Sequence, residues 1–513
     1  MEVSAVEGEN GQNDEPEILD LAIVGAGLSG LTAAKIITEK QCGITFRLFE
    51  KSTNPGGQLG GLKTCWITPN HFHAMKLCHD LKIPLKSMGN VREDSDRTQM
   101  RQSIGPFDAN KSVCESFLAS LRRALVRFES LRFMTELDSL CTTQQIIRDS
   151  TNMDEYLRRK LLFDESHRFF RFLVKIGTGF YPVELNVFEC LKLFRSMSSV
   201  RDLYKMLTLQ ESHLQPAGSP NWEVLVERLV SQLGEGTLRY SSNIVQVELS
   251  ADDQDQVVSL LDTTGRCWRA RYVILAVSCT DLVRINILPT QPYYFTEPNS
   301  QLGVWCMTSF TLLYPAASWH DHGYTGTLFL PDQWLICYES GRNQLSGTYF
   351  SPLRLIDETE RHLIRDHILR LLREHFRCYT LLKPMECQLE VYPIPFHFDV
   401  FPTFARRLIF ASTNVSCWYR GFINGSIQGG IRAAILALLE LRPQTITFEE
   451  VTDMQCIHFK YFKRHSRWIR VWYSLNLASV GRWALKVGVI LLAVAVCRRF
   501  LSVCITWPEL AEL

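Results

Sequence analysis

The chain has 513 residues, of which 46% are hydrophobic and 21% are charged, and 55 Lys and Arg against 54 Asp and Glu leave a formal net charge of +1. This composition is typical of a globular protein with about two to four domains, and it excludes a disordered chain, a collagen-like fibre and a small disulfide scaffold. Without an excess of positive charge it also argues against a nucleic-acid-binding protein, because duplex binding depends on cationic contacts with phosphate.

The beginning of the chain is strongly acidic. Residues 1–20 contain seven Asp and Glu, no Lys or Arg, and no apolar run that could act as a signal. This pattern is the opposite of a secretory or mitochondrial leader. We therefore predict a disordered acidic tail over residues 1–18.

The first ordered elements form a βαβ pattern. Residues 19–24 (LDLAIV) are an apolar run without polar alternation, which is typical of a strand buried on both faces of a parallel sheet. A glycine loop, a helix over residues 31–40 and a second strand over residues 44–50 follow. The loop has the spacing G-x-G-x-x-G, with its glycines at Gly25, Gly27 and Gly30. This context predicts a dinucleotide site, because the backbone can approach a pyrophosphate at the helix N-terminus.

The residues at and after the end of the second predicted strand narrow the choice of cofactor. Glu50 stands there, where a carboxylate can bond a ribose hydroxyl, although a solvated strand-end acid is the simpler structural alternative. The next turn, residues 54–58 (NPGGQ), contains a glycine pair. The segment FEKSTNPGGQ resembles the one that follows the first βαβ unit in FAD-binding oxidoreductases. We therefore expect FAD rather than a nicotinamide cofactor alone.

The rest of the chain predicts three further kinds of structure. Residues 111–235 show mainly amphipathic helical patterns, whereas from residue 237 the pattern changes to a β-meander. Residues 284–400 mix strand-like runs with one long helix over residues 357–376. A buried strand at residues 407–411, a loop and a helix from residue 421 close this part of the chain. The expected fold class is α/β, and α+β overall.

Successive blocks resemble the flavin-containing amine oxidases and, among them, the monoamine oxidases. The helical segments MDEYLRRKLLFDES and ELNVFECLKLFRSMSS are similar to that family, as is the meander from NWEVLVERLVSQLGEGTLRYSSNIVQVE to ARYVILAV. The block RRLIFASTNVSCWYRGFINGSIQGGIRAA resembles the family's C-terminal strand, loop and helix. The resemblance covers nearly the whole chain. It implies a Rossmann-like FAD-binding domain and a substrate-binding domain of mixed sheet plus helices.

The resemblance also implies how the chain is divided. The FAD-binding domain is made of three parts, residues 19–110, 236–283 and 401–445. A helical or substrate region over residues 111–235 and a substrate-binding domain over residues 284–400 lie between them. A basic connecting segment, residues 446–481, leads to a C-terminal segment, residues 482–507.

The same resemblance implies which residues contact flavin and substrate. In the family, the backbone at the start of the last helix contacts the flavin ring and an aromatic side chain faces the substrate, and these positions are Gly421, Phe422 and Ile423 here. Phe422 is therefore the expected catalytic-site residue, whereas Trp418 and Tyr419 are explained equally well as core aromatics. The other expected cofactor contacts, besides the three glycines and Glu50, are Leu28, Ser29, Lys51, Gly57, Gln58, Ile244 and Thr413.

Three departures separate the chain from the family pattern. Gln58 replaces an arginine of the family and is followed at once by Leu-Gly-Gly, so a hairpin is missing. The strand that carries a lysine near the flavin N5 in the family reads VWCMTSFTLLY here, and Ser309 or a neighbour takes its place. The segment that supplies the covalent flavin cysteine of monoamine oxidases has no cysteine. Cys387 lies upstream and is better explained as a buried structural residue, so we expect non-covalent FAD.

The sequence predicts no metal site. No Cys-x-x-Cys pair occurs, which excludes the common zinc and thioredoxin-type patterns. His320 and His322 lack further ligands at a useful spacing, so a polar surface loop explains them better.

The C-terminal segment, residues 482–507, has the pattern of a membrane anchor. Its uncharged run of 11 residues, 487–497, spans about 16 Å as a helix against a hydrocarbon core of about 30 Å. Flanking cations that reach the two interfaces would lengthen the span, and nearby Trp and Tyr residues would form an interfacial belt. We expect a tail anchor rather than a core helix, in the mitochondrial outer membrane facing the cytoplasm, with the endoplasmic reticulum as the alternative.

Together these features predict an FAD-dependent oxidoreductase resembling monoamine oxidase, which oxidises a small-molecule amine with O₂ to an aldehyde and hydrogen peroxide. No protein nucleophile is needed, because the flavin carries the chemistry. The missing lysine and cysteine motivate a second hypothesis, a degenerate relative that binds flavin or acts as a scaffold. Oxidation of a non-amine substrate is a third. The sequence leaves open which amine is used and whether the protein is a homodimer.

Overall fold

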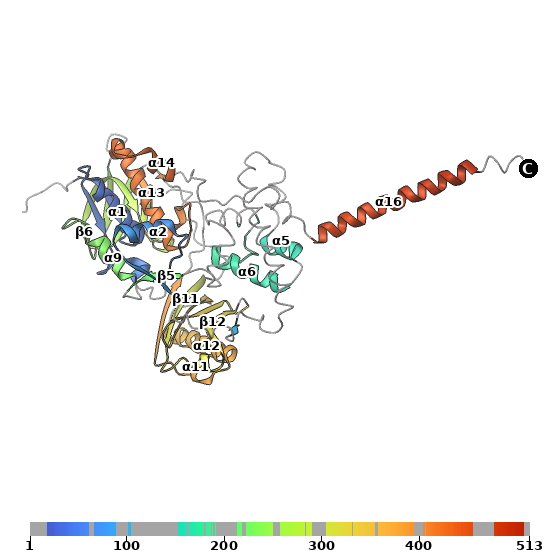
Figure 1. The fold of residues 1–513 in the computed structure, drawn as a ribbon. Coiled ribbons are helices and arrows are strands. Elements are labelled where there is room, and N and C mark those ends of the chain that lie inside the picture. Colours follow the sequence, from blue (N-terminus) through green and yellow to red (C-terminus); the bar gives the residue numbers. More distant parts are fainter. Residues whose placement is uncertain are drawn as a thin grey trace, which may run out of the picture.

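The computed structural model of the chain contains two large β-sheets, each covered by helices (Figure 1). It describes residues 18–60, 66–88, 101–103, 152–161, 164–178, 181–185, 187, 190, 213–217, 222–249, 257–282, 284–289, 304–330, 332–353, 358–393, 404–405, 407–454 and 477–506. Nearly all of the predicted acidic tail and most of the predicted basic connecting segment lie outside these residues.

The first sheet contains the predicted βαβ unit. Its main path has the order β10-β7-β8-β9-β1-β2-β6, and β17, which pairs with β16, attaches to β9. At its centre β1 (Ile18–Val24) pairs in parallel with both β2 (Phe46–Phe49) and β9 (Cys267–Leu275). The other strands are β6 (Leu238–Arg239), β7 (Ile244–Leu249), β8 (Val258–Asp262), β10 (Asn286–Leu288), β16 (Phe404–Ala405) and β17 (Leu408–Phe410). The predicted meander is β7, β8 and β9, whereas β6 pairs in parallel with β2 at the opposite edge.

Strand β1 is buried on both faces, as its unbroken apolar run predicts. Leu21 and Ile23 belong to the core beneath α1 (Leu28–Lys40) and α13 (Ile423–Leu441), which pack against each other. Ala22 and Val24 face the core on the other side, among residues of β7 and β8. Helices α2 (Phe72–Asp80) and α9 (Glu223–Val230) contribute to the same core as α1. The glycine loop and the start of α1 therefore lie at the carboxyl ends of the parallel strands β1, β2 and β9, within a sheet that also contains antiparallel pairs.

The second sheet has the order β15-β11-β14-β13-β12-β4. Its strands are β4 (Arg101–Ser103), β11 (Val304–Leu313), β12 (Tyr324–Leu330), β13 (Leu335–Gly341), β14 (Gln344–Leu353) and β15 (Glu386–Pro393). The pairings are antiparallel apart from that of β4 with β12. Helix α12 (Glu358–Phe376), the long helix expected from the sequence, contributes its apolar face to the same core as Phe310 and Leu312 of β11.

The remaining elements are short. Strands β3 (Leu85–Met88) and β5 (His213–Pro216) form a small antiparallel sheet. The helices are α5 (Met153–Lys160), α6 (Asp164–Thr178), α10 (Cys279–Leu282), α11 (Ser318–Asp321) and α14 (Phe448–Met454), with 3₁₀ turns η1 (Gly57–Gly60), η5 (Tyr379–Leu382), η6 (Thr413–Val415) and η7 (Pro443–Thr445). The surface loop predicted around His320 is wrong: this residue lies in α11, and its imidazole is 3.0 Å from the Glu339 carboxylate of β13.

Helix α6 packs against the second sheet through aromatic rings. The Trp334 ring, in the turn between β12 and β13, stacks with Phe172 of α6 at 5.9 Å and meets the edge of Tyr181 at 5.2 Å. The ammonium of Lys175 lies 4.1 Å from the centre of the Tyr181 ring, and this lysine is fully buried. Burial lowers the pKa of Lys175 from 10.5 to about 8, although the negative charge of Glu184 opposes the shift.

Replacement of Lys175 by methionine is expected to remove a rise in stability at alkaline pH. Below pH 8 both the folded and the unfolded chain bind the proton, so the folded state bears the cost of a buried charge. Between about pH 8 and 10.5 the unfolded chain binds more protons than the folded one, so wild-type stability rises with pH by up to about 3 kcal/mol. The variant should lack this rise and be the more stable protein at pH 7. Urea unfolding across this range measures the difference, and identical pH dependence would refute it.

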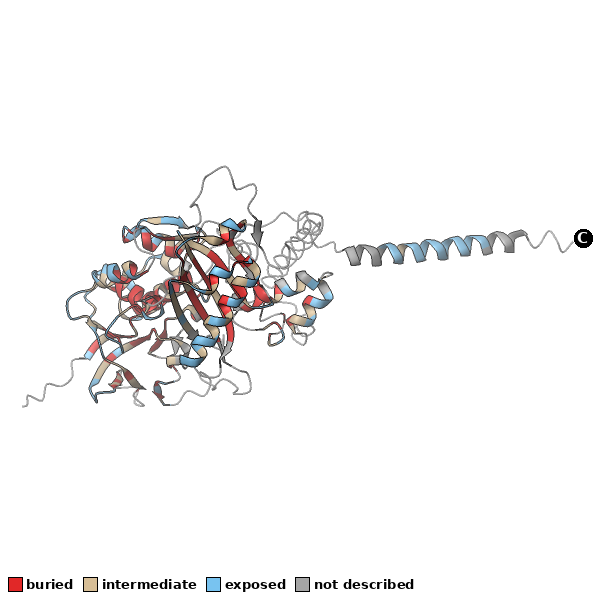
Figure 2. Cartoon of the chain, turned by 90° about the horizontal axis from the view of Figure 1, so that it is seen from below, coloured by how far each residue is buried: buried red, intermediate tan, exposed pale blue. Residues whose placement is uncertain are grey.

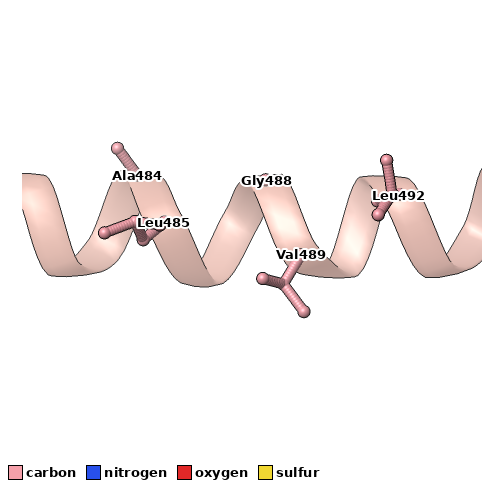
Figure 3. Close-up of a pocket in the computed structure, with 5 residues that line it drawn as sticks. All are labelled: Ala484, Leu485, Gly488, Val489 and Leu492. Carbon is pink, nitrogen blue, oxygen red and sulfur yellow. The ribbon is translucent and has the colours of Figure 1, made fainter.

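Helix α16 (Leu477–Thr506) extends away from the two sheets (Figures 1 and 2). Its described apolar side chains are exposed along the helix, among them Leu485, Val489, Ile490, Leu491 and Leu492. The shallow hollow in Figure 3 is lined by Ala484, Leu485, Gly488, Val489 and Leu492. Because all five residues come from one helix, this hollow is a notch beside Gly488 rather than an enclosed binding site.

A helix is therefore present where the sequence predicts one, but the predicted transmembrane span is not supported. Within the described parts of the chain, no helix combines the length and the apolar character that crossing a bilayer requires. Lys486 and Arg498 limit the uncharged stretch of residues 482–507 to the 11 residues between them, and charged side chains are costly in the hydrocarbon core.

Candidate functional site

The three glycines after β1 differ in what surrounds them. Gly25 has φ of +100°, and a Cβ there would lie 2.6 Å from the carbonyl oxygen of Ala276. A Cβ on Gly30 would lie 2.0 Å from the carbonyl oxygen of Gly25, so α1 approaches the loop closely only because this residue has no side chain. A Cβ on Gly27 would meet nothing within 4 Å. The loop is therefore tightly packed at both ends and open at Gly27, where a pyrophosphate fits against the N-terminus of α1.

The second glycine pair packs directly on this loop. The N–H of Gly56 donates to the carbonyl of Ala26 at 2.8 Å. Gly57 has φ of +55°, and a Cβ there would lie 3.3 Å from the Cα of Gly27. Gln58 follows in η1 and is exposed. The turn that resembles FAD-binding proteins thus forms a second wall beside Gly27, and contact of Gly57 and Gln58 with a cofactor stays a prediction.

Glu50 is buried and is not a solvated strand-end acid. Its Oε2 accepts the N–H of Ala26 at 2.8 Å, and its Oε1 accepts the N–H and hydroxyl of Ser52 at 2.9 and 2.8 Å. The carboxylate therefore holds the glycine loop to the end of β2. Since a carboxylate has about four acceptor sites, it retains capacity for a ribose hydroxyl.

Lys51 forms an ion pair across the carboxyl edge of the sheet. Its Nζ lies 2.8 Å from Oδ1 of Asp281, which follows β9. Burial alone would raise the pKa of Asp281, but hydrogen bonds from Lys51 and Ser278, together with the charge of Lys51, hold this pKa below its usual value. Because β1 lies between β2 and β9, the pair connects the two sides of the predicted crevice. A cofactor contact of Lys51 itself remains a prediction.

The first turns of α1 and α13 lie against each other. The Ser29 hydroxyl donates to the carbonyl of Ser426 at 2.9 Å, and a Cβ on Gly430 would lie 2.3 Å from the carbonyl oxygen of Ser29. Neither N-cap residue, Gly27 of α1 or Phe422 of α13, provides a side-chain cap. The structure thus brings together two positive helix ends from opposite ends of the sequence, and this is the chemistry that an anionic cofactor requires.

The loop before α13 is shaped by its own polar groups. Thr413 Oγ1 accepts the N–H of Gly421 at 2.7 Å, and Gly421 has φ of +81°. Trp418 and Tyr419 are buried, which supports their explanation as core aromatics, whereas Phe422 is only partly buried. Phe422 is therefore the aromatic residue of this loop that is open to a ligand.

The remaining predicted contacts are buried apolar residues. Leu28 and Ile423 are the first residues of α1 and α13. Ile244 begins β7, and two residues before it the N–H of Ser242 donates to the carbonyl of Glu50 at 2.8 Å. This hydrogen bond places the start of β7 beside the predicted ribose site. Whether Leu28, Ile244 and Ile423 contact a cofactor stays a prediction.

Sequence reasoning missed the residue that connects α2 to α13. Asn424 is fully buried, and its Oδ1 accepts the N–H groups of His73 at 2.9 Å and Ala74 at 3.2 Å. The sequence gives no sign of this role, because an asparagine in the first turn of a helix is common and the partners of Asn424 lie about 350 residues away in the chain.

Ser309 and Cys387, which lie at or near positions where the chain departs from the family pattern, are both on the second sheet. Ser309 of β11 is buried and pairs in register with Thr348 and Glu390. Cys387 of β15 is a free, partly buried thiol, and burial raises its pKa. Among the residues that the structure describes, no group of three or more His, Cys, Asp or Glu is arranged to hold a metal ion.

A parallel βαβ unit with an open glycine loop, in a chain that also contains a second mixed sheet, defines a dinucleotide-binding fold. The sequence profile of the flavin-containing amine oxidoreductases matches residues 28–379, and the chain belongs to this family. FAD is the cofactor that this family implies, and the open loop at Gly27 fits it.

Solved structures with a similar fold are amine oxidases. Cyclohexylamine oxidase from Brevibacterium oxydans IH-35A is 17% identical, with a TM-score of 0.61 over 83% of this chain and 100% of that one. Wild-type putrescine oxidase bound to putrescine is 15% identical, with a TM-score of 0.62 over 82% of this chain and 98% of that one. At these identities the likeness shows the fold alone. No curated protein sequence matches the chain.

Proposed function

We propose that the protein is an FAD-dependent amine oxidase resembling monoamine oxidase. The observation that carries this proposal is the junction at which the open glycine loop and the first turn of α1 meet the first turn of α13. Membership of the flavin-containing amine oxidoreductases supports the reaction class. The cyclohexylamine and putrescine oxidases of similar fold support an amine as the substrate.

Each part of the site has a separate task in this proposal. Gly27, with the first turn of α1, holds the pyrophosphate, and Glu50 holds the ribose. Gly421 and Ile423 approach the flavin ring with their backbone, and Phe422 faces the substrate. The buried aromatic residues behind Phe422 keep water out of this end of the site.

Bound flavin supplies the acceptor for the two electrons and the hydrogen removed from the carbon next to the amine nitrogen. For a primary amine the reaction balances as amine, O₂ and water giving aldehyde, ammonia and hydrogen peroxide. The protein provides orientation and a dry pocket and needs no nucleophile of its own. The absence of the family lysine from β11 is expected to slow the consumption of O₂ without preventing amine oxidation.

We also propose that the cofactor is bound without a covalent bond. A thiolate is the form of cysteine that reacts with electrophiles, and burial raises the pKa of the Cys387 thiol and so keeps it protonated. Its strand position, opposite Leu312, directs it toward the core under α12.

The test is a visible spectrum of the purified protein before and after acid precipitation, followed by a peroxide assay. Flavin bands that move to the supernatant, with peroxide formed from benzylamine, cyclohexylamine or putrescine, would support the proposal. Yellow protein without peroxide from any amine would favour a degenerate flavin-binding relative or a non-amine substrate. A colourless but cooperatively folded protein would exclude flavin chemistry.

We further propose that α16 attaches the protein to a lipid surface, with the mitochondrial outer membrane as the expected location and the endoplasmic reticulum as the alternative. Its exposed apolar side chains are accompanied by exposed Lys486, Arg498 and Arg499, and such cations are attracted to anionic lipid headgroups. The proposal is association with the surface, and it does not require that the helix crosses the bilayer.

The double substitution Leu491→Glu and Leu492→Glu is expected to abolish flotation of the full chain with anionic phospholipid vesicles, because it places charges in the middle of the apolar stretch. Leu363→Glu is the matched control, since Leu363 is an equally exposed leucine, on α12. The control should float like the wild type. A wild-type chain that stays in the dense fraction would exclude lipid attachment, and cell fractionation would then distinguish between the two organelles for a chain that floats.

A further inference from the structure

The N-terminal ends of α2 and α13 are joined at one place. His71 is the N-cap residue of α2, and Phe422 is the N-cap residue of α13. Asn424, in the first turn of α13, accepts two backbone N–H groups from the first turn of α2. The two N-cap residues are therefore held in a fixed relation by a hydrogen-bonded contact that includes neither of their side chains.

The side chains of these N-cap residues also meet. The His71 ring lies 5.6 Å from the Phe422 ring and 4.5 Å from the Tyr419 ring, which it approaches at 71°. Tyr419 and Phe422 are themselves perpendicular at 6.3 Å. Each of the three rings thus contacts the other two. The two pairs that include Tyr419 have the edge-to-face geometry that aromatic pairs prefer, whereas the His71 and Phe422 rings are tilted at 54°.

The His71 ring is fixed from its other side. This residue is fully buried, and its Nδ1 accepts the N–H of Thr68 at 3.5 Å. Tyr419 is fixed as well, because its backbone has φ of +51° and its ring is buried. Phe422 is the only one of the three that is partly exposed.

We propose that His71 is a positioning residue for substrate binding, which holds the Phe422 ring in the orientation that an amine contacts. This inference rests on the proposed function, which places Phe422 in front of the flavin. A partly exposed phenylalanine at a helix start has rotamer freedom unless its inner face is packed, and His71 with Tyr419 packs that face. The contribution of His71 is its ring, which the hydrogen bond from Thr68 keeps in place.

The test compares two substitutions that separate the ring from the hydrogen bond. His71→Phe keeps a ring and loses the acceptor for Thr68, whereas His71→Asn keeps an acceptor near the Nδ1 position and loses the ring. His79→Asn is the control, because His79 lies in α2 with a side chain that is 90% exposed. All are purified as full-length holoprotein and assayed with benzylamine for KM and kcat, and for flavin band shape during benzylamine titration.

The proposal predicts that H71N raises the KM for benzylamine about tenfold, with a smaller effect on kcat, because the loss of an aligned aromatic contact weakens binding. H71F should keep KM within about twofold of the wild type although it lowers Tm, since the ring is retained. H79N should leave all values unchanged. Equal KM values for H71F and H71N, whether raised or normal, would overturn the proposal.

The experiment distinguishes a failure of the proposed role of His71 from a failure of the proposed function. If the wild-type protein contains flavin but oxidises no amine, the proposed function fails, and the flavin band shape decides the role of His71. A spectrum altered by H71N but not by H71F would still support it, and three identical spectra would overturn it. A wild-type protein without flavin would overturn both.

Discussion

Replacement of Gly30 by alanine is expected to prevent stable folding of the first βαβ unit and with it flavin binding. The added Cβ would lie 2.0 Å from the carbonyl oxygen of Gly25 and 3.1 Å from the Cβ of Ala276. The first of these contacts is with backbone, so relief requires that α1 moves away from the end of β1. Separation of packed elements of this kind costs about 3 kcal/mol or more.

Gly27→Ala is the matched control for this prediction. A Cβ at Gly27 meets nothing within 4 Å, and its backbone at φ of −71° accepts any residue. This variant should therefore fold with an unchanged Tm. It should raise the Kd for FAD about tenfold or more, because the methyl group occupies the open side of the loop where the pyrophosphate approaches. Urea unfolding of the flavin-free proteins and titration with FAD measure the two effects. A G27A protein that binds FAD normally would show that the pyrophosphate lies elsewhere.

Replacement of Asn424 by leucine is expected to have the second largest effect, on the packing of α2. Leucine has nearly the same volume but no acceptor, so the N–H groups of His73 and Ala74 would lose their partner inside the protein. Each buried donor without an acceptor costs about 1–3 kcal/mol, so the loss of an acceptor for both N–H groups is expected to cost about 2–6 kcal/mol.

Asn424→Asp tests the acceptor directly, although it also replaces the Nδ2 group that lies 3.4 Å from Nδ1 of His73. Aspartate keeps the oxygen acceptor and adds a negative charge at the positive end of α2, where it is favourable. It should stay close to the wild type in thermal unfolding, whereas N424L should lower Tm by several degrees. Similar Tm values for N424L and the wild type would mean that the two N–H groups find other partners.

The first βαβ unit could be predicted from the sequence because its information is local. The apolar run of residues 19–24, the glycine spacing and the position of Glu50 all lie within about thirty residues, and each reflects a local steric or burial requirement. The same reason explains the long helix at α12. By contrast, only the family resemblance, and no residue pattern, distinguished Phe422 from its neighbours. The structure added that Trp418 and Tyr419 are buried whereas Phe422 is partly exposed.

Other parts of the prediction were wrong where a residue distant in the chain determines the local structure or the strand pairing. His320 looked like a loop residue because its partner Glu339 is 19 residues away on β13, and the short helix α11 that contains His320 has no clear pattern of its own. Strand β6 looked like part of the meander, but it pairs with β2 at the other edge of the sheet. The predicted transmembrane span is not supported for a local reason. Its uncharged stretch is only 11 residues long, and the prediction relied on flanking cations and aromatic residues to lengthen it.

The sequence by itself determined the dinucleotide loop, the family and hence the cofactor class, because backbone sterics and strand burial act between residues that are near in the chain. Only the tertiary structure decided how the site is assembled. The hydrogen bond from Ser29 to Ser426, the contact of Asn424 with α2 and the ring contact of His71 with Phe422 join segments about 350 to 400 residues apart. Such contacts depend on the packing of α1, α2 and α13 on one sheet, and no spacing along the chain encodes them.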